Sequence, residues 1–398
     1  MKIINCHKTF CFIVLSVLIS SCKDGDEPIV LCYAPKAKEP TSNQSGKFYE
    51  QRYVSDSNAD GRIDLCNVKT YDTSGNLLTL KIDNNADFKY DWIETSTYDA
   101  LGNELSYQVD DNGDGKNDWG SEFTYNAQGL LIKASYVSEY DVKSIYYYTY
   151  DNNANLLSIS TDMSADGSID YIITHTYDAS NNLVLIEYDN NGDGVIDTIT
   201  DYTHDINGNI LTTHRYENNQ LVYMTDSTYD QAGNLINFEV DSNGDGILDV
   251  IKACTFDSNG NEILCQFDYQ ADGIMDLVII REYDANNNMT VYKRDKNGDG
   301  IADYIQIREY DQNNNNISYK ADLNADGVFD SISLYEYDSN NNLTKRIYDR
   351  DADGIANSTH TYSYDSYGNL IQERLEHGDE FAEVGNSIKG FSYVFIPD

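Results

Sequence analysis

A tyrosine-aspartate pair returns along this chain about every 27 residues, and this period limits the folds that the chain can adopt. Each pair opens a segment such as "YDTSGNLL" or "YDSYGNLI", in which aspartate, glycine and asparagine favour a tight turn. The flanking runs, such as "IITHTYD", place β-branched and aromatic residues at nearly alternate positions, as strands do. The chain is therefore predicted to be an array of β-hairpins. The twelve copies begin at Tyr71, Tyr98, Tyr125, Tyr150, Tyr177, His204, Tyr229, Phe256, Tyr283, Tyr310, Tyr337 and Tyr364.

The register of each hairpin follows from a comparison of the copies. If the first residue of a pair (position i) faces i+7, then i−2 faces i+9. These second pairs include Arg281 with Tyr292 and Tyr335 with Arg346, so the two residue types exchange strands and remain opposed, as cation–π partners would. The i+7 column is almost wholly aliphatic. We therefore expect the tyrosine column and the i+7 column to form a core face.

An acidic nine-residue loop alternates with the Tyr-Asp turn, so that each repeat reads strand, turn, strand, loop. Several copies follow D-x-N-x-D-G-x-x-D, as "DNNGDGVID" at 189–197 does. Oxygen ligands at positions 1, 3 and 5 with glycine at 6 are typical of calcium loops. Carboxylates this close repel one another unless a cation offsets their charge. The loops span residues 56–64, 83–91, 110–118, 162–170, 189–197, 241–249, 268–276, 295–303, 322–330 and 349–357.

We predict Ca²⁺ in up to ten of these loops, and purely structural acidic turns are the alternative. Binding should be weaker where Phe88 replaces the glycine, where Ser164 or Gln270 replaces asparagine, and where Asn357 replaces the last aspartate. The predicted ligands, at positions 1, 3, 5 and 9, are Asp56, Asn58, Asp60, Asp64, Asp83, Asn85, Asp87, Asp91, Asp110, Asn112, Asp114, Asp118, Asp162, Ser164, Asp166, Asp170, Asp189, Asn191, Asp193, Asp197, Asp241, Asn243, Asp245, Asp249, Asp268, Gln270, Asp272, Asp276, Asp295, Asn297, Asp299, Asp303, Asp322, Asn324, Asp326, Asp330, Asp349, Asp351, Asp353 and Asn357.

Two family resemblances follow from these motifs. The loops resemble the calcium loops of integrin α-subunit propellers, which close β-hairpins and use position 9, and they lack the position-12 glutamate of an EF-hand. The Tyr-Asp segments, over about residues 50–375, resemble the YD repeats of the Rhs family. That resemblance implies a continuous antiparallel sheet wound into a spiral shell. The expected fold is therefore all-β, an array of about 12 antiparallel hairpin repeats wound as a spiral sheet or solenoid, with a β-propeller as the alternative.

The N-terminal residues are typical of an exported lipoprotein. A basic start precedes an apolar run from Phe10 to Ile19, which is too short to span a bilayer as a mature helix. The run ends in "LISSC", which resembles a bacterial lipobox and would make Cys22 the lipidated residue; an ordinary secretory signal is the alternative. The expected location is the bacterial outer membrane, exposed at the cell surface. The predicted parts are a signal peptide (1–21), a flexible tether (22–46), the β-hairpin repeat domain with calcium loops (47–376) and a C-terminal cap (377–398).

Four further cysteines would remain in the mature chain, an even number in a compartment that permits disulfides. Cys254 and Cys265 occupy the opposed i−2 and i+9 positions of one hairpin, so we predict a disulfide between them, with two small buried thiols as the alternative. Whether Cys32 pairs with Cys66 is left open by the sequence.

Charge and motif content narrow the function. The net charge of −40, from 67 acidic and 27 basic residues, repels nucleic acid, so we expect no nucleic-acid partner. The six histidines have no protease or triad spacing, and no glycine-rich phosphate loop occurs, so we expect no enzymatic activity. The sequence predicts a surface-anchored, calcium-binding adhesion or scaffold protein with an extracellular protein or glycan as ligand. A carbohydrate-binding module and a truncated Rhs-type shell protein are the alternatives.

Overall fold

The computed structural model describes residues 46–137, 143–378 and 386–397, which form 26 β-strands. Within these ranges no helix has the length and apolar character needed to cross a bilayer. The strands are β1 (Gly46–Asp56), β2 (Leu65–Tyr71), β3 (Leu77–Asp83), β4 (Trp92–Tyr98), β5 (Glu104–Asp110), β6 (Trp119–Tyr125), β7 (Leu131–Val137), β8 (Lys143–Tyr150), β9 (Leu156–Asp162), β10 (Tyr171–Tyr177), β11 (Leu183–Asp189), β12 (Thr198–His204), β13 (Ile210–Glu217), β14 (Gln220–Tyr229), β15 (Leu235–Asp241), β16 (Val250–Phe256), β17 (Glu262–Asp268), β18 (Leu277–Tyr283), β19 (Met289–Asp295), β20 (Tyr304–Tyr310), β21 (Asn316–Asp322), β22 (Ser331–Tyr337), β23 (Leu343–Asp349), β24 (Ser358–Tyr364), β25 (Leu370–His377) and β26 (Ser387–Pro397).

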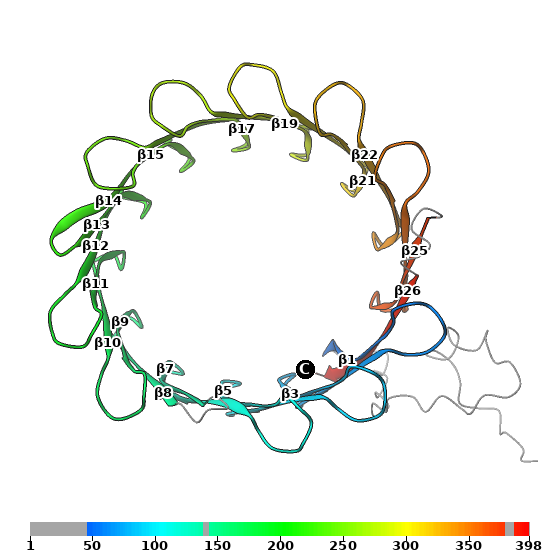
Figure 1. The fold of residues 1–398 in the computed structure, drawn as a ribbon, viewed down its shortest axis with the longest axis horizontal. Helices are drawn as coiled ribbons and strands as arrows, with labels where there is room; N and C mark the ends of the chain where they lie inside the picture. Colours follow the sequence, from blue (N-terminus) through cyan, green and yellow to red (C-terminus); the bar gives the residue numbers. More distant parts are fainter. Residues whose placement is uncertain (1–45, 138–142, 379–385, 398) are drawn as a thin grey trace, which may run out of the picture.

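The strands close into a single antiparallel barrel (Figure 1). Each strand pairs with the next along the chain, and β26 pairs with β1 from Gly46 to Asp56. The predicted open spiral sheet or solenoid is therefore wrong, and so is the alternative propeller. The physical reason lies outside the repeat. β1 and β26 are 11 residues long and cover each other's hydrogen-bonding edge, so that neither end of the sheet is left unpaired.

The two sequence motifs lie at opposite rims of the barrel. Every acidic loop joins an odd-numbered strand to the following even-numbered strand, whereas every Tyr-Asp turn joins an even-numbered strand to an odd-numbered one. In an up-and-down antiparallel sheet these two kinds of connection fall at opposite ends. Figure 1 shows the long loops projecting outward around the ring and the short turns directed inward. We call these the loop rim and the turn rim.

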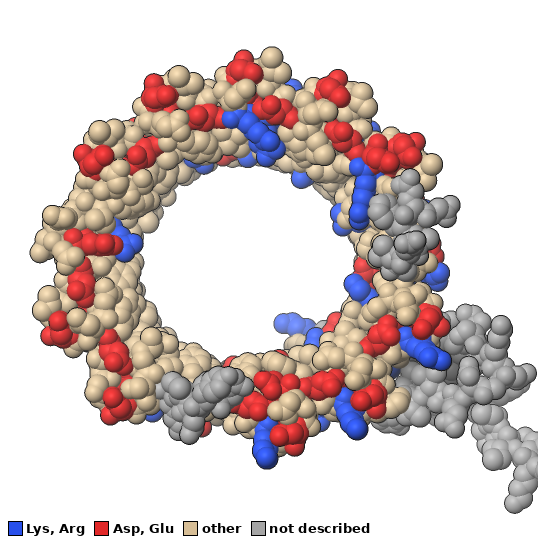
Figure 2. Space-filling model, viewed as in Figure 1, with Lys and Arg blue, Asp and Glu red and all other residues tan. Residues whose placement is uncertain are grey.

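The barrel is a hollow ring of a single sheet layer (Figure 2). Its 26 strands, at a spacing of about 4.8 Å, give a radius of about 20 Å before strand tilt is counted. Side chains cannot fill a lumen of this width. Few apolar side chains of the described residues are fully enclosed, among them Val109, Ala134 and Ala321. The expected core face is therefore a half-buried surface, on which side chains pack along the sheet rather than against a second layer.

Each hairpin contains a β-bulge next to its turn. Arg281 faces Tyr292 as the i−2/i+9 register predicts, and its guanidinium carbon lies 5.5 Å from the centre of the tyrosine ring. Tyr283, however, faces Met289 at i+6, so the predicted i/i+7 pairing is wrong. The turn closes through the backbone N–H of Asp284, the next residue, and the extra residue of the returning strand is absorbed as a bulge.

The Tyr-Asp motif is explained by the hydrogen bonds of the turn rim. The hydroxyl of Tyr310 donates to the carbonyl of Met289 at 3.1 Å, which ties one hairpin to the one before it. Asp311 accepts both the backbone N–H of Asn315 at 2.9 Å and its side-chain amide at 3.0 Å. The hydrogen bond from the side-chain amide is the largest cause that holds the pKa of Asp311 below its usual value. The same Asn315 amide donates to Asn341 of the next turn at 3.0 Å, so that the turns are linked along the rim.

Candidate metal site

Each acidic loop folds around the carboxylate of its first aspartate. In loop 241–249 the residue Asp241 is 0% exposed, and its Oδ2 accepts the N–H of Gly246 at 2.7 Å. Burial raises the pKa of Asp241, but hydrogen bonds from loop N–H groups outweigh it and leave the pKa below its usual value. Asp249 at position 9 accepts the N–H of Ser242 at 2.7 Å. Part of the acidic pattern therefore closes the loop whether or not a metal binds.

The predicted ligands are divided between two environments. The position-1 aspartates are buried from the second loop to the last, whereas the position-5 aspartates are exposed. Acidic side chains gather around the outward loops in Figure 2. Among the described residues, one loop alone brings three carboxylates together. Oxygen atoms of Asp349, Asp351 and Asp353, at positions 1, 3 and 5, lie within 4.8 Å of one another.

Loop 349–357 differs from the other loops at position 3. Asp351 stands where they have asparagine, serine or glutamine, so position 3 supplies a third charge. Position 9 is the neutral Asn357, which accepts the N–H of Arg350 and so takes the loop-closing role of the aspartate. In the remaining described loops the carboxylates at positions 1, 5 and 9 do not all lie within 4.8 Å of one another. The carboxylate at position 3 thus distinguishes loop 349–357.

The buried aspartate of this loop has an oxygen atom that lacks a partner among the described residues. Asp349 is 8% exposed, and its Oδ2 accepts the N–H of Gly354 at 2.9 Å. Its Oδ1 accepts no hydrogen bond from any residue that the structure describes. In loop 322–330 the equivalent Oδ1 of Asp322 accepts the N–H of Asp326 at 3.2 Å. A buried carboxylate oxygen without a donor is costly unless a cation supplies the missing interaction.

The donor set of loop 349–357 fits a hard divalent cation. Three carboxylate side chains within mutual reach are the ligands that Ca²⁺ prefers. Asp349, Asp351 and Asp353 would hold such an ion, and its charge would satisfy the unpartnered oxygen of Asp349.

The cysteines and the termini complete the predicted sites. Cys254 and Cys265 form a disulfide across the hairpin of β16 and β17, with their Cα atoms 4.2 Å apart. Cys66 is also disulfide-bonded. Residues 1–45, which include Cys22 and Cys32, lie outside the described residues. The C-terminal segment contributes β26, the strand that closes the barrel.

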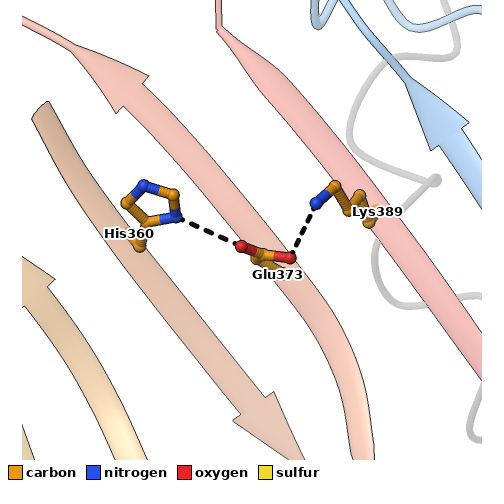
Figure 3. Close-up of polar contacts among 3 residues, drawn as sticks. All are labelled: His360, Glu373 and Lys389. Carbon is orange, nitrogen blue, oxygen red and sulfur yellow. Dashed lines mark hydrogen bonds and ion pairs between the residues drawn. The ribbon is translucent and has the colours of Figure 1, made fainter. Parts of the chain in front are cut away.

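A polar cluster that the sequence did not indicate lies where the barrel closes (Figure 3). Glu373 of β25 contacts His360 Nδ1 of β24 at 3.1 Å and accepts from Lys389 Nζ of β26 at 3.0 Å. Burial raises the pKa of Glu373, but the hydrogen bonds and charges of Lys389 and His360 outweigh it and lower the pKa overall. Strand pairing places Glu373 directly opposite Lys389. The cluster therefore links the last three strands, β24, β25 and β26.

Comparison with known proteins gives structural neighbours only. No protein-family model and no curated protein matches this chain. The crystal structure of TcdB2-TccC3-Cdc42 aligns with a TM-score of 0.42 and 16% identity, over 81% of this chain and 18% of that chain. A porin-like protein from Bacteroides uniformis aligns with a TM-score of 0.24 and 13% identity, over 62% of this chain and 94% of that one. This chain thus spans about a fifth of the TcdB2-TccC3 chains, and likenesses of this degree establish neither a family nor a function.

Proposed function

We propose that this chain is a non-enzymatic, calcium-binding ring that acts as an extracellular scaffold or binding protein. The observation that carries the proposal is loop 349–357, in which oxygen atoms of three carboxylates lie within 4.8 Å of one another and the buried Oδ1 of Asp349 has no hydrogen-bond donor among the described residues. A hard cation is the chemistry that this arrangement lacks. A one-layer ring with a broad, half-buried surface also suits contact with partners.

Calcium would act on the whole loop rim. The net charge of −40 disfavours the compact ring through self-repulsion, and the acidic loops concentrate that charge at one rim. We propose that loop 349–357 fills first. The other loops, whose position-1 carboxylates already accept N–H groups, would fill at higher calcium concentration.

The ring is proposed to stand outside the cell. The lipobox-like "LISSC" supports lipidation at Cys22, and the following polar residues to 46 would serve as the tether. Adhesion to an extracellular protein or glycan remains part of this proposal.

A calcium-binding measurement on paired variants tests the proposal. Isothermal titration of the calcium-free chain should resolve one tightest site. Asp351→Asn, which gives loop 349–357 the position-3 residue of its neighbours, should remove that site. Asn324→Asp, which gives loop 322–330 carboxylates at positions 1, 3 and 5, should add a site of similar affinity. No calcium uptake by the wild type, or unchanged uptake by both variants, would overturn the proposal.

A second candidate function, a truncated Rhs-type shell, is favoured by the open lumen (Figure 2). A sheet of about 20 Å radius leaves a lumen that is wide enough to surround a segment of another chain. Under this proposal a bound polypeptide should copurify with the ring and resist protease until the ring is unfolded. Ring preparations that hold no second polypeptide at any stage of isolation from the native host would eliminate the shell.

A further inference from the structure

A groove on one face of the sheet crosses β3 to β6 and contains two glutamates, one of which departs from the repeat. Its volume of about 340 Å³ is at the small end of the range for ligand pockets. Tyrosine, phenylalanine and leucine side chains form its walls, and Glu94 and Glu104 lie among them. The main lining residues are Leu77, Leu80, Ser96, Tyr98, Tyr107 and Phe123.

Glu104 occupies a position that is aliphatic in most repeats. It stands at i+6, six residues after Tyr98, where the other repeats mostly have leucine, isoleucine or methionine. Glu262 is the other acidic residue in this column, and there the chain supplies a counter-charge: Arg281 of the neighbouring strand forms an ion pair with it. A carboxylate at i+6 is therefore accommodated elsewhere in the ring by a guanidinium group.

Glu104 has no such counter-charge within the described part of the chain. Phe123 of β6 occupies the i−2 position that Arg281 holds in β18. Among the described residues, no lysine, arginine or histidine forms an ion pair with either Glu94 or Glu104. The groove thus holds two carboxylates that have no basic partner among the residues described. The pair of Arg281 with Glu262 shows that the fold can place a guanidinium group beside a carboxylate at i+6.

Aromatic rings surround these carboxylates. Trp92 Nε1 donates to Glu94 at 2.8 Å, and the rings of Tyr107 and Trp119 lie 5.6 Å apart. Burial is the largest cause that raises the pKa of Tyr107 to about 12, and the charge of Glu94, a hydrogen bond with Glu94 and the charge of Glu104 raise it further. The two carboxylates thus give the groove a negative potential. Negative potential beside aromatic faces is the environment that attracts an organic cation. A guanidinium group carries a positive charge and offers only donors, so it compensates the charge of these carboxylates, which a neutral sugar would leave uncompensated.

We propose that this groove binds a guanidinium group, with Glu94 and Glu104 as counter-charges and Phe123 and Tyr107 as aromatic faces. The ring contains the same arrangement within its own chain, where Arg281 pairs with Glu262 and stacks on Tyr292. The guanidinium would come from an arginine side chain of a partner protein or from a small free molecule. This site is independent of calcium, because it lies on the sheet face and not in an acidic loop.

The chain provides its own optical probe for this site. Trp92 and Trp119 are its only tryptophans, and they lie 6.1 Å apart beside the groove. Titration of the full chain with methylguanidinium chloride should give a saturable change in tryptophan fluorescence in the millimolar range, corrected against sodium chloride of equal ionic strength. The same titration is repeated with N-acetylarginine methylamide, which represents an arginine residue within a polypeptide. Tighter binding of this amide indicates an arginine of a partner protein, whereas equal binding indicates a small molecule.

Glutamine variants test the roles of the two carboxylates. Glu94→Gln and Glu104→Gln should each weaken binding about tenfold, the value of a charge-assisted hydrogen bond. Glu122→Gln is the matched control, because Glu122 precedes Phe123 on β6, is exposed and lies on the opposite sheet face. Its affinity should equal that of the wild type. No saturable response of the wild type, a response to neutral sugars instead, or equal weakening by the control would overturn the proposal.

If the glutamine variants fold poorly, a variant that fills the groove with a side chain of its own tests the proposed site. Phe123→Arg places an arginine where β18 has Arg281, so its guanidinium should pair with Glu104 and occupy the groove. This variant should keep the circular dichroism spectrum of the wild type and lose the response to methylguanidinium. A folded Phe123→Arg ring that still binds methylguanidinium would refute the proposed site.

Discussion

Calcium should stabilise the ring by the amount that a single bound ion supplies. The size of this stabilisation distinguishes one calcium site, in loop 349–357, from ten equal sites in all the loops. At 10 mM Ca²⁺ and a Kd of about 10⁻⁴–10⁻³ M, as extracellular modules have, one site adds about 1.4–2.7 kcal/mol to the free energy of unfolding. Ten equal sites would add about 14–27 kcal/mol. The geometry favours the smaller value, because three carboxylates converge only in loop 349–357 among the described loops.

The corresponding change in melting temperature is measurable. A repeat domain of roughly 330 residues has an unfolding entropy of about 0.7 kcal/mol/K, so one site should raise Tm by about 2–4 °C. Differential scanning calorimetry of the chelated chain, with and without Ca²⁺, gives this shift. Asp351→Asn should abolish most of it, and Mg²⁺ should not replace Ca²⁺, since it demands a tighter octahedral site.

Two outcomes would refute this reasoning in opposite ways. A Tm that does not respond to Ca²⁺ would mean that the unpartnered oxygen of Asp349 does not mark an ion site. A shift of tens of degrees that persists in Asp351→Asn would mean that all loops bind alike and that position 3 decides nothing.

Three further predictions concern the fold. Tyr310→Phe should lower the free energy of unfolding in urea by about 1 kcal/mol, because it removes the hydroxyl bond between hairpins, whereas Tyr269→Phe, at an exposed loop position, should change it little. Replacing Cys254 and Cys265 by serine should cost about 3 kcal/mol for the short loop that the disulfide closes, and peptide mapping without reductant should recover the linked pair from the wild type. Because the folded-state pKa of Glu373 is lowered, its contribution is present at neutral pH and is lost as the pH falls through that lowered value. Glu373→Gln should therefore lower Tm at pH 7, and the deficit should vanish at strongly acidic pH; a deficit independent of pH would contradict this.

Local structure could be predicted from the sequence because it repeats. Twelve copies of one motif fixed the hairpins, the turn positions and the register of Arg281 with Tyr292. The bulge was not predictable in the same way, since alternation alone does not reveal that the turn consumes one more residue on the returning strand. The pairing of Tyr283 with Met289 instead of i+7 follows from that bulge.

Closure was not predictable from the repeat, because it depends on the curvature summed over all strands and on the pairing of the first and last strands. β1 and β26 carry no Tyr-Asp motif, yet their pairing decides between a spiral and a barrel. The candidate metal site shows the same limit. The spacing identified all ten loops, and the neutral Asn357 at position 9 suggested weak binding in the last of them. The geometry instead makes Asp351 the residue that distinguishes this loop.

A closed sheet of antiparallel strands has a circumference that can change only in fixed steps. Each 27-residue unit brings two strands, which lengthen the perimeter by about 10 Å and the radius by about 1.5 Å. Gain of a single strand would make the first and last strands parallel and would move every later acidic loop to the turn rim. Tandem duplication or loss of whole units is therefore the route by which rings of this kind can change size, and relatives should differ in lumen width by whole repeats.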